Sequence, residues 1–159
     1  MSPCVRVRRR RAWVPIAFGL GLTALAGPAV SQQDAAELRG SWEAQGYVLS
    51  GGATHAVRGQ IHFTQTDWLV LFFVMDGAEP ARGSAEGGRY TLQGDLLTFE
   101  HLHHLSVGRE LAGLAASPLR METSAEGAKE PTRIELDADS LTLLFPSGNR
   151  MTFVRSSAP

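Results

Sequence analysis

Short runs in which apolar and polar residues alternate with a period of two recur along this chain of 159 residues. Residues 68–75 form a longer apolar run, rich in aromatic and β-branched side chains and of strand length. A helix of that composition would be apolar on every side, which a domain this small has little room to bury. Period-two runs occupy residues 60–64, 89–92, 97–101, 133–136, 141–143 and 150–155.

Turn-forming residues separate these runs, at 50–52, 66–67, 83–88, 94–95, 137–139 and 146–149. We interpret the glycine-rich residues 83–88 as a flexible hairpin loop. Residues 34–39 have the composition of a short helix before the first strand. Strands at short spacing with tight turns predict an all-β antiparallel meander, a barrel or a sandwich, with one short N-terminal helix.

An internal repeat favours the barrel. Residues 90–99 and 134–143 share one pattern, apolar-x-Leu-x-small-Asp-x-Leu-Thr-apolar, at an offset of 44 positions. We expect each copy to be a hairpin with its Asp in the turn, where the carboxylate accepts backbone N–H bonds. Two copies are too few for a solenoid, so they fit a meander of similar hairpins closing on itself.

The first 31 residues have the three parts of a secretory signal peptide: a cationic start, an uncharged stretch over 12–30, and small residues at Ala29-Val30-Ser31. We expect cleavage after Ser31, a mature domain of residues 32–159, and a periplasmic or secreted location. Arg10-Arg11 followed by apolar residues also resembles the twin-arginine pattern, so both export routes stay open. The alternative is an uncleaved anchor, since 19 uncharged residues approach the length that spans a bilayer. After processing we expect no integral membrane segment.

Charge is distributed unevenly about this boundary. Residues 1–31 hold five of the 15 Lys and Arg and none of the 16 Asp and Glu, which leaves residues 32–159 with a net charge of −6. This excludes a basic domain that wraps nucleic acid. The single cysteine, Cys4, lies in the signal, so the mature domain has no disulfide and no thiolate metal site.

The motif Gly40-Ser41-Trp42 follows the expected helix, and Arg155 ends the last predicted strand. Together with the repeated hairpins and the length, this arrangement resembles the lipocalin-like proteins of the calycin group over residues 36–156. The resemblance implies a lipocalin-like β-barrel in which Trp42 closes the floor and Arg155 packs over its ring. A guanidinium over an indole gains about 0.5–2 kcal/mol. The family has no single activity to transfer.

The one dense cluster of side chains that can transfer protons or bind metals consists of His101, His103 and His104. Alternate residues of a strand share a face, so Leu97, Phe99, His101 and His103 should point inward, whereas His104 should point outward. One bulge would invert this parity. His101 and His103 could line a ligand cavity, start a metal site, or be ordinary imidazoles at a strand end. We expect no metal, because the remaining ligand candidates, His62 and Glu100, face outward by their own strands.

The sequence therefore predicts an exported binding module that holds a small apolar or amphipathic ligand, without a cofactor, as a monomer or homodimer. The predicted ligand-binding residues are His101, His103, Phe99, Leu97, Phe63 and Val70. Two alternatives stay open: an isomerase, cyclase or hydratase on the same barrel using His101 or His103 as acid and base, or an envelope interaction protein with a filled core. No catalytic residue is assigned, and an enzyme is the less favoured class. Residues 68–75 are apolar on both faces, which keeps a dimer or membrane contact open.

Overall fold

The computed structural model describes residues 32–156. The predicted signal peptide, its cleavage site and the last three residues of the predicted domain lie outside this part of the chain. Within it, one helix precedes nine strands, and the predicted all-β meander with a short N-terminal helix is confirmed. The elements are α1 (Gln32–Leu38), β1 (Gly40–Val48), β2 (Thr54–His55), β3 (Val57–Phe63), β4 (Asp67–Asp76), β5 (Glu79–Gln93), β6 (Leu96–Gly108), β7 (Ser117–Leu136), β8 (Ser140–Leu144) and β9 (Arg150–Arg155).

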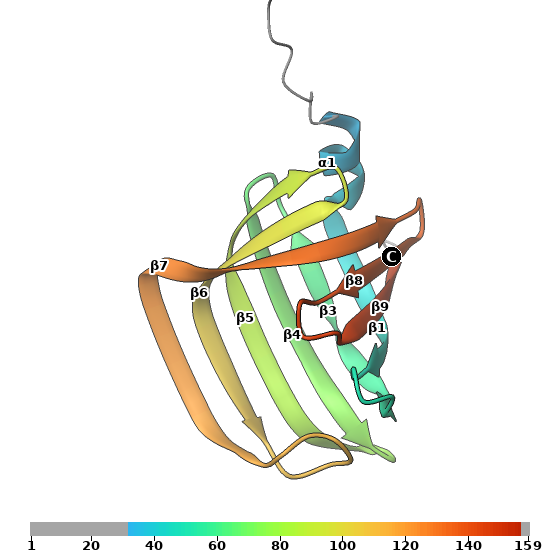
Figure 1. The fold of residues 1–159 in the computed structure, drawn as a ribbon, viewed down its shortest axis with the longest axis vertical. Helices are drawn as coiled ribbons and strands as arrows, with labels where there is room; N and C mark the ends of the chain where they lie inside the picture. Colours follow the sequence, from blue (N-terminus) through green and yellow to red (C-terminus); the bar gives the residue numbers. More distant parts are fainter. Residues whose placement is uncertain (1–31, 157–159) are drawn as a thin grey trace, which may run out of the picture.

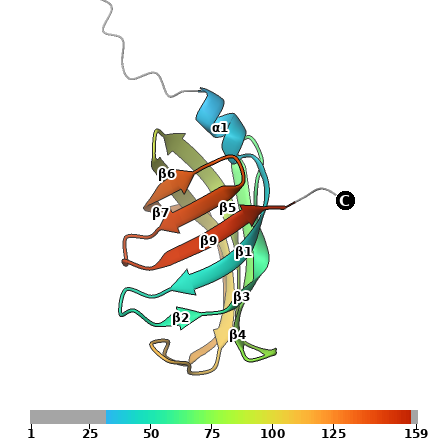
Figure 2. The ribbon, with the colours of Figure 1, turned by 90° about the vertical axis from the view of Figure 1, so that its right-hand side faces the viewer.

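Antiparallel neighbours follow the order of the chain, and β1 also pairs with β9. In the described part of the chain, eight strands therefore close into a barrel, while the two-residue β2 extends the edge beside β1. The helix α1 lies at one end of the barrel (Figures 1 and 2). Figure 1 shows β4 to β7 running on past β8 and β9, so the barrel continues at its other end into an open, curved sheet.

The two copies of the repeat form matching hairpins. In the first, Tyr90 pairs with Phe99 and Leu92 with Leu97. In the second, the corresponding pairs are 134 with 143 and 136 with 141. Both copies are therefore hairpins, as predicted, with equivalent pairs and with the Asp-containing segments at the turns.

The core fills the end of the barrel next to α1. Trp42 is fully buried, and its indole N–H donates to the carbonyl of Leu38, 2.8 Å away. The guanidinium carbon of Arg155 lies 4.0 Å from the centre of the Trp42 ring. Arg155 also donates to the carbonyls of Glu37, Arg39 and Ala138, so one side chain ties α1 and a turn to the last strand. Inward side chains of several strands complete this end, among them Phe63, Leu97, Leu141, Leu143 and Phe153.

The glycine-rich residues 83–88 are not a loop, so that prediction is wrong. They lie in the middle of β5, paired with β4 on one side and β6 on the other. A Cβ at Gly88 would stand 1.9 Å from the carbonyl oxygen of Glu100, which shows how closely the two backbones approach. Gly88 therefore lies where two strand backbones approach closely, a common role of glycine inside a strand.

Candidate functional site

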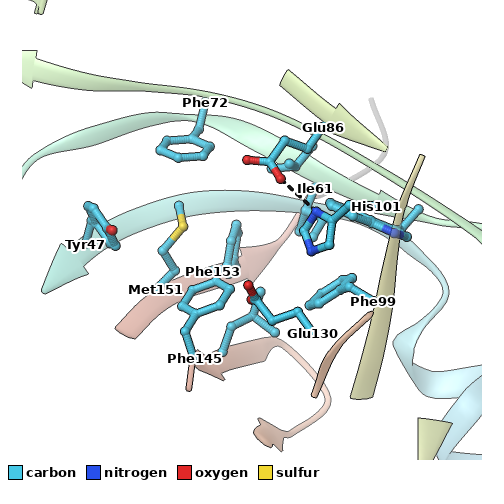
Figure 3. A pocket seen from close by; sticks show the side chains of 13 residues that line it. Tyr47, Ile61, Phe72, Glu86, Phe99, His101, Glu130, Phe145, Met151 and Phe153 are labelled. Carbon is cyan, nitrogen blue, oxygen red and sulfur yellow. Dashed lines mark hydrogen bonds and ion pairs between the residues drawn. The ribbon is translucent and has the colours of Figure 1, made fainter. Parts of the chain in front are cut away.

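A cavity of about 180 Å³ lies inside the barrel, beyond the filled end. Its walls come from β1, β3 to β9 and the segment between β8 and β9 (Figure 3). Most of the lining is apolar, and six of the lining side chains are aromatic. The lining residues are Tyr47, Ile61, Trp68, Val70, Phe72, Glu86, Phe99, His101, Glu130, Leu143, Phe145, Met151 and Phe153.

An ion pair between Glu86 and His101 is part of this wall. Nδ1 of His101 lies 2.9 Å from one carboxylate oxygen of Glu86 (Figure 3). The other oxygen accepts a hydrogen bond from the Ser84 hydroxyl and lies 3.4 Å from Nδ1 of His104. His104 in turn has its Nε2 2.8 Å from the Ser106 hydroxyl. A polar network thus extends from the cavity wall onto the open sheet.

Both partners of this pair favour their charged forms. The hydrogen bond to Glu86 raises the pKa of His101, and this effect exceeds the opposing effect of burial. For Glu86, burial alone would raise the pKa, but the hydrogen bonds from His101 and Ser84 and the charges of His101 and His104 together outweigh it, so its pKa lies below the ordinary value. With Nδ1–H donated to Glu86, Nε2 of His101 is the nitrogen whose protonation changes.

Two polar groups of the cavity wall make no hydrogen bond to protein. Within residues 32–156, these are the buried Nε1 of Trp68 and Nε2 of His101. Their rings pack edge to face, with centroids 5.1 Å apart. Both nitrogens lie beside the Glu86–His101 pair in the cavity wall.

Glu130 is the second carboxylate of the cavity. It pairs with Phe99 across β6 and β7, which places its side chain on the inner face. The Thr132 hydroxyl donates to it over 3.4 Å, and this is its one side-chain hydrogen bond among the described residues. Burial is the main cause that raises the pKa of Tyr47, and the hydrogen bond to Glu86 is the main cause that raises the pKa of His101; the charge of Glu130 adds a smaller effect in the same direction to each. Glu130 therefore has more unused hydrogen-bonding capacity than Glu86.

Three of the six predicted ligand-binding residues line the cavity: Val70, Phe99 and His101. Two others, Phe63 and Leu97, are buried in the filled end next to α1 and do not line it. The sixth, His103, is exposed, and its Nδ1 lies 3.1 Å from the Thr123 hydroxyl.

The prediction that His103 points inward and His104 outward is therefore wrong. Against β5, His101 pairs with Gly88 and His103 with Gly87, so Leu102 is an extra residue that bulges out of the register. One extra residue exchanges the two faces of everything that follows. Gly88 and Gly127 lie against the backbone around this bulge, where a Cβ would overlap carbonyl oxygens.

Ten of the thirteen lining residues were not predicted from the sequence, among them Glu86, Glu130, Tyr47 and Phe145. Glu86 lies within the residues interpreted as a loop, and a strand over 79–93 would have placed it inward with Tyr90 and Leu92. Glu130 is set four residues before Ile134, so extending the period-two run backward would have found it. Tyr47 follows a register shift between Ala44 and Gly46, for which the sequence gives no clear signal.

The described residues contain no group of three His, Cys, Asp or Glu side chains placed to hold a metal ion. In residues 32–156, no helix combines the length and the apolar character needed to cross a membrane.

No protein-family model matches this chain, and the search of curated proteins returned no match. Among solved structures, the chain is similar to a de novo designed fluorescence-activating β-barrel. The two are 17% identical, with a TM-score of 0.38, and the alignment covers 77% of this chain and 96% of the designed one.

Proposed function

We propose that residues 32–159 form a lipocalin-like barrel whose cavity binds a small apolar or amphipathic molecule. The observation that carries this proposal is the cavity of about 180 Å³ with a mainly apolar wall and a few polar groups. Ligand sites in proteins commonly have this composition, in which apolar area supplies affinity and a few polar groups set orientation. The packing of Arg155 over Trp42 supports the lipocalin-like assignment.

The volume limits the ligand to a small one. An apolar cavity of about 150 Å³ accommodates benzene, so the cavity described here suits one ring with a short substituent. In this proposal Val70 and Phe99 contact the apolar body of the ligand, and His101 faces its polar end.

We also propose that residues 1–31 are a cleaved signal peptide and that the barrel acts in the periplasm or outside the cell. The five arginines and the uncharged run that follows support this location. N-terminal sequencing of protein exported by its host should read from Gln32. Protein recovered from the cytoplasm with Met1 intact would contradict the proposal.

Calorimetric titration with phenethyl alcohol tests the binding function. The wild type should bind it saturably, and Val70→Phe, which fills the cavity, should weaken binding by about tenfold or more. Leu71→Phe is the matched control, since Leu71 is the next residue of β4 and points outward. Circular dichroism establishes that both variants fold. Absence of saturable binding by the folded wild type, or equal weakening by the two variants, would count against the cavity as a ligand site.

A further inference from the structure

The charges of the cavity do not balance. Its wall contains two carboxylates, Glu86 and Glu130, and one imidazole, His101. His101 lies 2.9 Å from Glu86, and these two charges offset one another. Glu130 is left with one long hydrogen bond from a neutral hydroxyl. The side chains that line the cavity therefore have a net charge of −1 when His101 is protonated and both carboxyl groups are ionised.

Aromatic rings surround the space into which this carboxylate points. Figure 3 shows Glu130 directed into the cavity between Phe145 and His101, with Phe72 and Tyr47 across from it. The rings of Tyr47 and Phe72 are 6.3 Å apart and meet edge to face, so they present two differently inclined surfaces. The face of an aromatic ring carries partial negative charge and attracts a cation within about 6 Å.

We propose that the ligand is a small organic cation, a protonated amine or a quaternary ammonium ion with an apolar body. This rests on the proposed binding function and specifies the ligand class for the same cavity. Glu130 supplies the charge partner, the aromatic rings supply cation–π contacts, and the apolar wall contacts the rest of the molecule. Carboxylic acids are disfavoured, because their charge would enter a cavity that already has a surplus carboxylate.

The rest of the domain supports this preference for a cation. Residues 32–159 have a net charge of −6, which attracts cations at long range and repels anions. His101 does not oppose the cation, because Glu86 offsets its charge at close range. A ring with a two-carbon ammonium tail has the size that the cavity admits.

Three probes of nearly equal shape test the proposal: phenethylamine, phenethyl alcohol and hydrocinnamate. Calorimetric titration of the wild type near neutral pH should rank the amine about tenfold tighter than the alcohol, with the acid weakest. An alcohol that binds as tightly as the amine would overturn the cation inference and leave the binding function intact. Failure of all three probes to bind the folded protein would overturn the binding function itself.

The variant Glu130→Gln separates charge from shape. It should reduce the affinity for phenethylamine to that of phenethyl alcohol, while the affinity for the alcohol changes by less than about twofold. Glu135→Gln is the matched control, because Glu135 lies on the same strand, is exposed and is not part of the cavity wall. If Glu135→Gln weakens amine binding as much as Glu130→Gln does, the effect is long-range and the assignment to Glu130 is wrong.

Discussion

The strands β5, β6 and β7 cross two regions of opposite polarity. Near α1 their inward side chains are apolar, as at Tyr90, Leu97 and Ile134, and their outward ones are mostly polar. Beyond the cavity the inward positions are polar, and the outward ones of β4, β6 and β7 are apolar and exposed. The inward set comprises Ser84, Glu86, His104, Ser106, Arg120 and Glu122, and the outward set Leu69, Leu71, Phe73, Leu105, Val107, Leu119 and Met121.

This difference shows that alternation defines two faces of a sheet without stating which one is the core. Closure of the barrel decides that question. Where β8, β9 and β1 complete the ring, the inner face is enclosed and the apolar set is buried. Where β4 to β7 run on past these strands, the inner face is open and carries polar groups (Figure 1).

The largest expected effect contrasts two leucines, one from each region. Leu97 is fully buried at the filled end, whereas Leu69 is 61% exposed on the open sheet. Leu97→Ala should lower the free energy of unfolding by about 2–5 kcal/mol, because it removes transfer energy and leaves a cavity. Leu69→Ala should change it by less than about 0.5 kcal/mol.

Urea denaturation of both variants measures this contrast. Comparable losses would mean that the outer face of β4 is covered by another surface in solution, and that the two regions do not differ as described.

A smaller effect is expected at the closed end from Arg155. Its guanidinium lies over Trp42 and donates to three backbone carbonyls. Arg155→Ala should lower the free energy of unfolding by about 1–2 kcal/mol. Arg155→Lys keeps the charge but loses the planar guanidinium, so its stability should fall between those of Arg155→Ala and the wild type.

Arg133→Ala serves as the control, because Arg133 forms only an exposed ion pair with Asp95. It should cost no more than about 0.5 kcal/mol. Equal denaturation midpoints for Arg155→Ala and Arg133→Ala would remove the structural role of the Trp42–Arg155 contact.

The sequence predicted the closed end well because its signals there are local. The repeated hairpins contain both the strand alternation and the turn residues that determine register, and both copies fold with the same pairs. The contact between Trp42 and Arg155 was predicted from a resemblance, and the structure brings the two side chains together.

The open region was harder to predict because its geometry depends on contacts between strands. The bulge at Leu102 requires close approach by Gly88 and Gly127, from two other strands, and no local pattern in 97–104 reveals it. Glycines at 83–88 have the composition of a turn, yet here they lie within a strand. For these reasons His104 was misplaced and Glu86 was missed, whereas Glu130 was within reach of the local period-two pattern.

The smallest expected effect is a dependence of stability on pH from the Glu86–His101 pair. The pKa of His101 is raised above its ordinary 6.5, so its contribution is fully present below that pH and is lost as pH rises through the folded-state value. The pKa of Glu86 is lowered below its ordinary 4.5, so its contribution is present above that pH and is lost as pH falls through the folded-state value. The pair should therefore stabilise the fold most between these two ordinary values.

Denaturation of the wild type and His101→Gln at a series of pH values tests this expectation. The stability difference between them should be largest between the two ordinary values and should shrink as the pH rises above 6.5 through the raised folded-state pKa of His101. His103→Gln is the matched control: His103 is exposed, faces the Thr123 hydroxyl and is not the partner of Glu86, so this variant keeps the Glu86–His101 pair and the pH dependence that the pair causes. The contrary outcome is a pH-dependent stability difference for His103→Gln and a constant one for His101→Gln. In that case His103, not His101, would be the partner of Glu86, and the inward orientation of His101 at the bulge would be wrong.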